Sequence, residues 1–144
     1  SLGGVLRQRY PHRHAVRTDR ALYDYVQEIK NEHLRNTAPL SKVAFDGKLR
    51  VIGQALGTHT RIARVQGARL KSKNEIRIAA VFKEMPLQFL RMIVVHELAH
   101  LRIRDHDKEF YRLCQYMEPA YYQLEFDARV WLLWRDAEEG SSVE

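Results

Sequence analysis

The feature that most restricts the fold of this chain is a histidine-rich segment, HELAHLRIRDH, at residues 96–106. His96 and His100 are four residues apart, so on an α-helix both imidazoles lie on one face and can bind the same metal ion. Glu97 is rotated away from that line, where it can hold a water molecule instead of binding the metal. On a continuous helix His106 would lie about 240° around the axis from His100. The segment therefore predicts a helix that ends soon after His100 and a chain that turns back.

A third protein ligand is needed, because a catalytic zinc ion has three protein ligands and one open position. His106 is the preferred candidate because it comes from the adjacent loop, and a glutamate from the following helix, Glu109 or Glu118, is the alternative. The spacing from His100 to His106 equals that of the metzincins, but Ile103 stands where the metzincins have glycine. The sequence thus predicts one Zn²⁺ per chain, in a protein that is not a metzincin.

Four segments have the apolar periodicity of amphipathic helices. They cover residues 18–36, 87–102, 108–117 and 121–136. Pro86 suits the first turn of the second helix, and Asp107 is the expected N-cap of the third. Residues 1–17 lack periodicity, so we expect a basic N-terminal arm followed by a single domain over residues 18–144.

Three segments have the composition of β-strands. KVAFDGKLRVI holds Asp46-Gly47 between two β-prone runs, which is the pattern of a tight hairpin. TRIARV predicts a further strand, and the alternation in NEIRIAAVF predicts a strand partly covered on both faces. Helices around a small sheet indicate an α+β fold. A chain of 144 residues buries a core without disulfides or a structural metal, so we expect any bound metal to be functional.

Composition limits the compartment and the partners. The single cysteine, Cys114, excludes an intramolecular disulfide and a cysteine-based zinc cluster, and it fits a reducing, cytoplasmic compartment. We expect no membrane span and no signal peptide, because the apolar runs are too short. The net charge is +6, with basic groups near the N-terminus and over residues 61–77. Such groups either attract nucleic acid or acidic protein, or only keep the surface soluble.

Other residues are candidates for supporting roles at the metal. The candidates for a second electrophile, besides the arginines, are Tyr111, Tyr121 and Tyr122, although each one taken singly is more often a packing residue. The candidates for partners that orient the imidazoles are Asp105, Glu125 and Asp127. The residues expected in the core are Cys114, Trp131 and Trp134, and those expected at the surface are His12, His14, His33 and His59.

The segment HELAHLRIRDHDKEFY resembles the motif of the YgjP-like zinc metallopeptidase family. That motif has HELxHL, a third histidine six residues after the second, a small cap residue and an aromatic residue. The matching positions here are His96, Glu97, Leu98, His100, Leu101, His106, Asp107, Phe110 and Tyr111. The resemblance continues back through NEIRIAAVFKEMPLQFLRMIVV and forward to MEPAYYQLEFDARVWL, over about residues 60–134. The family usually carries Arg-Trp-Gly-Ser-Cys before the strand, of which only Gly67 is present here.

This resemblance implies a small zincin-like domain, in which a short β-sheet packs on the active-site helix and flanking helices. It implies a zinc metallopeptidase that cleaves a peptide or protein, with Glu97 as the general base. It also implies that the strand before the active-site helix is an edge that binds an extended peptide by strand addition. The residues expected to contact that peptide are Ile76, Arg77, Ile78 and Ala79.

Two other functions stay open. The first is a DNA-associated protease, since the related SprT-like and WLM proteases act on proteins bound to nucleic acid. The second is a non-catalytic metal-binding module, against which Glu97 counts, because a purely structural site has no use for it. The basic arm, with His12 and His14 in PHRH, is also a candidate to cover the cleft or reach the metal.

Overall fold

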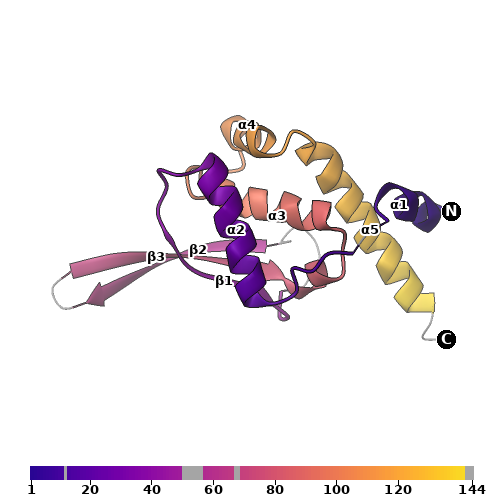
Figure 1. Ribbon diagram of the computed structural model, residues 1–144, viewed down its shortest axis with the longest axis horizontal. Coiled ribbons are helices and arrows are strands. Elements are labelled where there is room, and N and C mark those ends of the chain that lie inside the picture. Colours follow the sequence, from indigo (N-terminus) through magenta and orange to yellow (C-terminus); the bar gives the residue numbers. More distant parts are fainter. Residues whose placement is uncertain (12, 50–56, 67–68, 142–144) are drawn as a thin grey trace.

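The computed structural model describes residues 1–144 apart from residues 12, 50–56, 67–68 and 142–144. Its elements are α1 Leu2–Arg9, α2 Asp19–His33, β1 Leu40–Asp46, β2 Gly57–Gln66, β3 Arg69–Ala79, the 3-10 helix η1 Ala80–Lys83, α3 Leu87–Ala99, α4 Lys108–Met117 and α5 Tyr121–Ser141. Helices pack around a small sheet, so the α+β prediction is confirmed (Figure 1). None of the described helices combines the length and the hydropathy that crossing a membrane requires.

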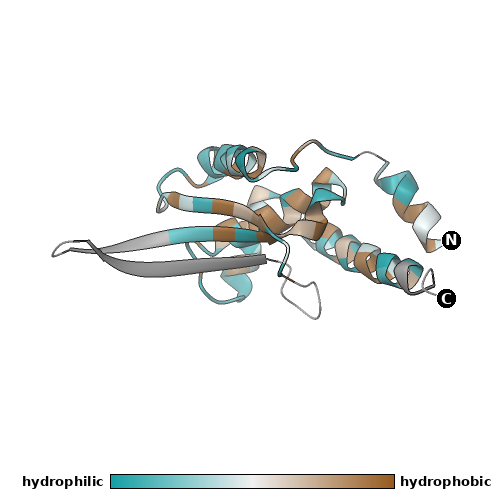
Figure 2. Ribbon diagram, turned by 90° about the horizontal axis from the view of Figure 1, so that it is seen from below, coloured by the Kyte–Doolittle hydropathy of each residue, from teal (hydrophilic) through white to brown (hydrophobic). Residues whose placement is uncertain are grey.

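In the described residues the sheet has three strands in the order β1-β3-β2. β1 runs parallel to β3, with Val43 opposite Ile76, and β2 runs antiparallel to β3, with His59 opposite the same Ile76. β3 is therefore the central strand. The sheet lies beside α2 and α3, and the residues nearest to these helices are hydrophobic (Figure 2).

The prediction that Ile76, Arg77, Ile78 and Ala79 lie on an edge strand is wrong, whereas their contact with a substrate stays a prediction. The first three residues have a paired neighbour in both β1 and β2, and Ala79 is paired with Asp46 of β1. Backbone groups that already form ladder hydrogen bonds are not available for an added peptide strand. The alternation of apolar residues along a strand reports how its two faces are covered, and it carries no information about its two edges.

The predicted hairpin is described only in its first half. β1 ends at Asp46, whose Oδ1 accepts a hydrogen bond from the backbone N–H of Lys48 at 2.8 Å in the expected turn. The predicted second strand falls mainly on residues 50–56, outside the described residues. The described pairing of β1 is with β3. The strand predicted at TRIARV is present within β2.

Helix α3 forms the centre of the molecule. It begins after Pro86, as predicted, and its buried residues are Phe89, Leu90, Met92, Ile93, Val94, Val95, Glu97, Leu98 and Ala99. A helix that is hydrophobic nearly all the way round is a core helix. It contacts the sheet and the helices α2, α4 and α5. Side chains in its last turn, including His96, are therefore held by packing on several sides.

Residues 1–17, expected to be an aperiodic arm, contain helix α1, which lies beside the C-terminal half of α5 (Figure 1). Asp127 of α5 accepts hydrogen bonds from Arg9 Nη1 at 2.9 Å and from the Tyr10 hydroxyl at 2.5 Å. An added Cβ on Gly3 would lie 2.6 Å from the Trp134 ring. An eight-residue helix with two glycines has weak intrinsic stability, so these contacts with α5 stabilise it.

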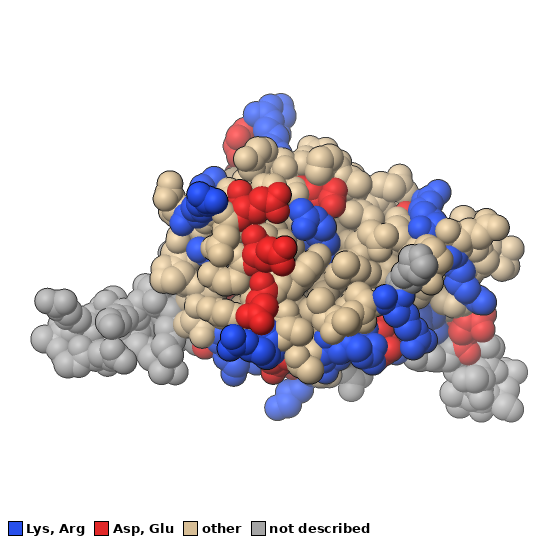
Figure 3. Space-filling view, in the orientation of Figure 1, with Lys and Arg blue, Asp and Glu red and all other residues tan. Residues whose placement is uncertain are grey.

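The charge on the surface is unevenly distributed. Asp24, Glu28 and Glu32 are exposed and four residues apart on α2, so they form an acidic stripe along one helix face. Figure 3 shows acidic side chains gathered in the middle of this view, with Lys and Arg nearer its borders. This face of the molecule is therefore poorly suited to binding a nucleic-acid backbone.

The Asp127 contacts predict an acid-dependent contribution to stability. Burial by itself would raise the pKa of Asp127, but hydrogen bonds from Tyr10, Arg9 and Gln123 outweigh it and lower the pKa. A lowered pKa stabilises the fold above the unfolded value of about 3.9, and this stabilisation is lost as the pH falls through the folded value. We expect Asp127→Asn to lower the free energy of unfolding by about 1–3 kcal/mol at pH 7.

Urea denaturation of the wild type and Asp127→Asn at pH 7 and near pH 3 measures this difference. The difference in the free energy of unfolding between the two proteins should become smaller at the lower pH. Asp136→Asn, an exposed position on the same helix, is the matched control and should change stability little. A gap that stays constant with pH would show that the carboxylate charge of Asp127 is not involved.

Candidate functional site

The turn that joins α3 to α4 ends the first helix where the histidine spacing requires. α3 runs to Ala99, and His100 is its C-cap. The backbone N–H groups of His100, Leu101 and Arg102 bond to carbonyls three residues earlier, at 3.2, 3.0 and 3.1 Å, which tightens the last turn. Asp107 then caps α4, and its Oδ1 accepts a hydrogen bond from the N–H of Phe110 at 2.9 Å. These two caps fix the loop that carries His106.

The loop brings the three predicted histidines together. His106 Nε2 lies 3.1 Å from His96 Nε2 and 3.1 Å from His100 Nε2. Within the described part of the chain, these three residues form a group whose candidate ligand atoms all lie within 4.8 Å of one another. Nitrogen ligands about 2.0–2.1 Å from a tetrahedral zinc ion are about 3.4 Å apart. The spacing of the three Nε2 atoms therefore fits one metal ion.

The Nδ1 atoms of two of these rings also have hydrogen-bond partners. His100 Nδ1 lies 3.0 Å from the carbonyl oxygen of Ile103. A carbonyl oxygen only accepts hydrogen bonds, so Nδ1 carries the proton and Nε2 of the neutral ring presents a lone pair. His96 Nδ1 lies 2.7 Å from the hydroxyl of Tyr121, at the start of α5. Such partners fix the tautomer and the orientation of metal-binding imidazoles.

Two of the histidines, His96 and His100, are held in the neutral form that binds metal. Burial, followed by the neighbouring His100 and His106, lowers the pKa of His96 to about 3. Burial also lowers the pKa of His100. Lone pairs that converge within 3.1 Å repel one another unless a cation or a shared proton lies between them. The donor set of this site therefore fits a metal ion chemically as well as geometrically.

Glu97 is the carboxyl group next to this cluster. It is 2% exposed, and its Oε2 lies 3.9 Å from His96 Nε2. Among the described residues its Oε1 has no hydrogen-bond partner. Burial raises the pKa of Glu97 to about 8. A buried carboxyl with a free oxygen beside the metal-binding nitrogens is suited to take a proton from a water molecule in the site.

The alternative third ligands, Glu109 and Glu118, do not join the three histidines. Glu109 pairs with Arg112 at 2.8 Å on the exposed side of α4. Glu118 pairs with Arg91 at 3.2 Å and caps the turn before α5. Neither belongs to the group that can hold a metal ion.

The expected partners of the imidazoles were not the ones observed. Asp127 binds Arg9 and Tyr10 beside α1, and Glu125 binds Arg129 at 2.5 Å. Tyr121 takes this role instead, although the sequence suggested it only as an electrophile. Its hydroxyl lies at the nitrogen that faces away from the three-histidine centre. A tyrosine two residues after Pro119 carries no sequence signal that separates an orienting partner from a core residue.

Other predicted residues lie elsewhere. Cys114 is buried, as expected, and burial raises the pKa of its thiol to about 12. His14 is partly buried, and its Nε2 lies 2.9 Å from the carbonyl oxygen of Phe82. The prediction that PHRH reaches the metal is therefore wrong for His14, and His12 lies outside the described residues. His33 is also partly buried rather than at the surface, and it packs against the ring of Tyr116.

The chain is similar to proteins of one known family. Residues 11–127 match the family described as YgjP-like, metallopeptidase domain. The chain belongs to the YgjP-like family. A curated relative, the UTP pyrophosphatase of Escherichia coli (strain K12), is 57% identical over 131 residues, which cover 91% of this chain and 78% of that protein. No solved structure matches the chain.

The three-histidine site predicts that His106 is needed for metal binding. We expect His106→Ala to lose most bound zinc, because two nitrogen ligands hold the ion much less tightly than three. Elemental analysis of purified protein and a zinc titration measure this change. Glu109→Ala is the control that should keep about one zinc per chain. Zinc lost from Glu109→Ala but retained by His106→Ala would move the third ligand to the glutamate.

The contact between Tyr121 and His96 predicts a smaller effect on metal affinity. Tyr121→Phe removes only the hydroxyl, so the packing of α5 should be kept. We expect zinc affinity to fall by about 10–100-fold, as for other partners of metal-binding histidines. Competition with a chromogenic chelator gives the affinity. Tyr122→Phe, the exposed neighbour, should bind zinc like the wild type, and equal affinities for all three proteins would contradict the role of Tyr121.

Proposed function

We propose that this protein is a metal-dependent hydrolase in which His96, His100 and His106 hold one Zn²⁺ and Glu97 is the general base. The observation that carries the proposal is the buried Glu97 carboxyl, 3.9 Å from a metal-binding nitrogen and with one unpaired oxygen. When bound, the zinc ion supplies an electrophilic centre and lowers the pKa of a water molecule to about 7. A purely structural metal site would not require a carboxyl group at this position.

The residues of the chain have distinct tasks in this proposal. Glu97 Oε1 accepts a proton from the attacking water molecule, and the same carboxyl later gives the proton to the leaving group if that group needs one. The low pKa of His96 keeps its imidazole neutral throughout. Tyr121 holds that ring at Nδ1, so that the opposite nitrogen, Nε2, would face the metal ion. The buried surroundings of Glu97 keep bulk water away from the proton that is being transferred.

For the substrate, the 57% identity with a UTP pyrophosphatase favours UTP. Water would attack the α-phosphorus, the bond between that phosphorus and the bridging oxygen would break, and UMP and pyrophosphate would form. Pyrophosphate is a stable anion and leaves without prior protonation. This proposed reaction therefore needs Glu97 mainly as a base.

Hydrolysis of a peptide bond is the second candidate, favoured by the family description, which names a metallopeptidase domain. An amine leaving group is strongly basic, so here Glu97 must also return the proton. The central position of β3 removes one structural reason for this candidate, because the strand expected to bind the peptide is paired on both sides.

The remaining expectations stay predictions. Nucleic-acid contact was expected from the basic residues between positions 61 and 77, and the side chains at positions 61–73 lie outside the described part of the chain. A cytoplasmic location is likewise proposed only from the use of a single cysteine.

The proposal predicts that Glu97→Gln loses activity and keeps the metal. Glutamine preserves the size of the side chain but cannot accept the proton, so we expect hydrolysis to fall by about 10²–10⁴-fold. Pyrophosphate release from UTP and cleavage of an unfolded protein are measured in parallel, together with zinc content. Glu109→Gln, on the exposed side of α4, is the control for the loss of one negative charge.

Each outcome of this experiment has a definite meaning. Pyrophosphate release that depends on Glu97, without proteolysis, supports the UTP assignment. Proteolysis that depends on Glu97, without pyrophosphate release, supports the peptidase assignment. Full activity of Glu97→Gln in either assay would contradict the hydrolase mechanism.

A further inference from the structure

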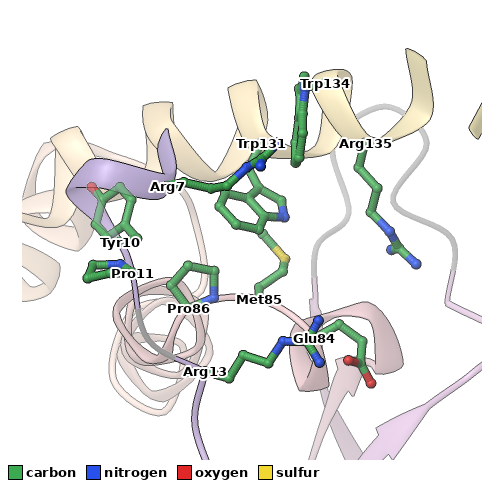
Figure 4. Close-up of a pocket in the computed structure, with 10 residues that line it drawn as sticks. All are labelled: Arg7, Tyr10, Pro11, Arg13, Glu84, Met85, Pro86, Trp131, Trp134 and Arg135. Atoms are coloured by element: carbon green, nitrogen blue, oxygen red, sulfur yellow. The ribbon is translucent and has the colours of Figure 1, made fainter. Parts of the chain in front are cut away.

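A pocket lies at the opposite end of α3 from the histidines. It has a volume of about 410 Å³ and lies between the N-terminal segment, the start of α3 and the last turns of α5 (Figure 4). Its lining residues are Arg7, Tyr10, Pro11, Arg13, Glu84, Met85, Pro86, Trp131, Trp134 and Arg135. None of the three histidines, nor Glu97, is among them. Nine residues of helix, about 14 Å along the axis, separate Leu87 from His96.

One wall of this pocket is aromatic and firmly held. The rings of Trp131 and Trp134 meet edge to face with centroids 5.6 Å apart. Trp131 also packs edge to face on buried Phe89, at 5.8 Å, and Tyr10 packs on the same ring at 4.6 Å. Close contact between Gly3 and the Trp134 ring fixes the helix α1 against this wall. The pocket therefore has a preformed aromatic wall.

The rest of the lining is cationic. The Arg7 guanidinium lies 5.4 Å from the centroid of the Trp134 ring, so this charge is held over an aromatic face. Arg13 and Arg135 line the pocket together with its one carboxylate, Glu84. Arg17, which does not line the pocket, binds that carboxylate at 2.5 Å and offsets its charge. Arg7 and Arg13 therefore bring positive charge to a lining whose one carboxylate already has a partner.

The N-terminal end of α3 lies next to the pocket. Its N-cap is Pro86, which lines the pocket, and no side chain caps this end of the helix. The backbone N–H groups of the first turn, such as that of Leu87, have no partner inside the helix. They carry the positive end of the helix dipole, which attracts anions.

We infer that this pocket binds a free nucleotide at a site separate from the three-histidine centre. The base would lie against the aromatic wall at Trp131, and the phosphates would meet Arg7 and Arg13. Indole faces bind flat aromatic rings, and guanidinium groups bind phosphate oxygens with paired hydrogen bonds. A plain anion would not use the aromatic wall, and an apolar ligand would not use the arginines. The volume is in the range of about 300–1,000 Å³ typical of small-molecule sites.

The chain carries its own reporter for this site. Its two tryptophans are Trp131 and Trp134, so intrinsic tryptophan fluorescence monitors this pocket and no other part of the molecule. The experiment titrates UTP into full-length protein freed of metal with a chelator. A saturable change in fluorescence is expected, and it should persist in His106→Ala. Binding at the pocket is thereby measured independently of metal loading and of any hydrolysis.

Charge variants then test the arginines. Arg7→Gln should weaken UTP binding by at least about tenfold, because it removes one charged hydrogen-bonding partner. Arg20→Gln, on the exposed surface of α2, removes the same charge away from the pocket and should bind like the wild type. Arg13→Gln provides a second variant if circular dichroism shows that Arg7→Gln disturbs α1. Equal affinities for Arg13→Gln, Arg20→Gln and the wild type would overturn the inference.

Three further probes decide the class of ligand. Uridine and inorganic triphosphate should each bind at least about tenfold more weakly than UTP, because each offers only half of the recognised chemistry. Triphosphate binding as tightly as UTP would reduce the site to an anion site and overturn the assignment to a nucleotide. A single-stranded oligonucleotide that binds more tightly than UTP would overturn the assignment to a free nucleotide, and absence of any saturable change would exclude the site altogether.

Discussion

The burial of α3 on nearly all sides is the constraint on which the rest of the structure depends. A core helix that packs against a sheet and three other helices cannot shift without disturbing each of those contacts. His96 and His100 therefore keep a fixed separation, and the site is completed by a single loop residue, His106. The same packing holds Glu97 in a place where its carboxyl lacks a full set of partners. A buried polar group in that condition is costly, and the packing energy of α3 offsets the cost.

The local features of the site could be predicted from the sequence, whereas its long-range partners could not. The end of α3 and the cap of α4 at Asp107 follow from interactions between residues a few positions apart. The order of the strands does not, because a central strand and an edge strand can have the same side-chain pattern. The contact of Tyr121 with His96 spans 25 positions, and tyrosine is common both in cores and in sites. Helix α1 was missed because it is stabilised by α5 rather than by its own composition.

The family description and the name of the relative differ in the bond that is cleaved but agree on hydrolysis. This difference is physically reasonable, because an activated water molecule and a nearby base can attack a phosphorus or a carbonyl carbon. What separates the two reactions is the charge of the substrate and the basicity of the leaving group. Three neutral imidazole ligands would leave the full charge of a divalent ion in place. A centre of that kind suits the polyanionic substrate that we propose.

The exposure of the three histidines is unequal, and this has a consequence for how the site is filled. His96 and His100 are partly buried in the end of a core helix, whereas His106 is exposed on the loop before α4. An ion can therefore enter and leave from the side of that loop without any opening of the hydrophobic core. Because α3 is held by packing rather than by a metal, the chain should fold first and acquire its ion afterwards. The fraction of protein with bound metal would then follow the concentration of metal in the surroundings. A folded molecule without metal could bind an ion later, and could release it again, without unfolding.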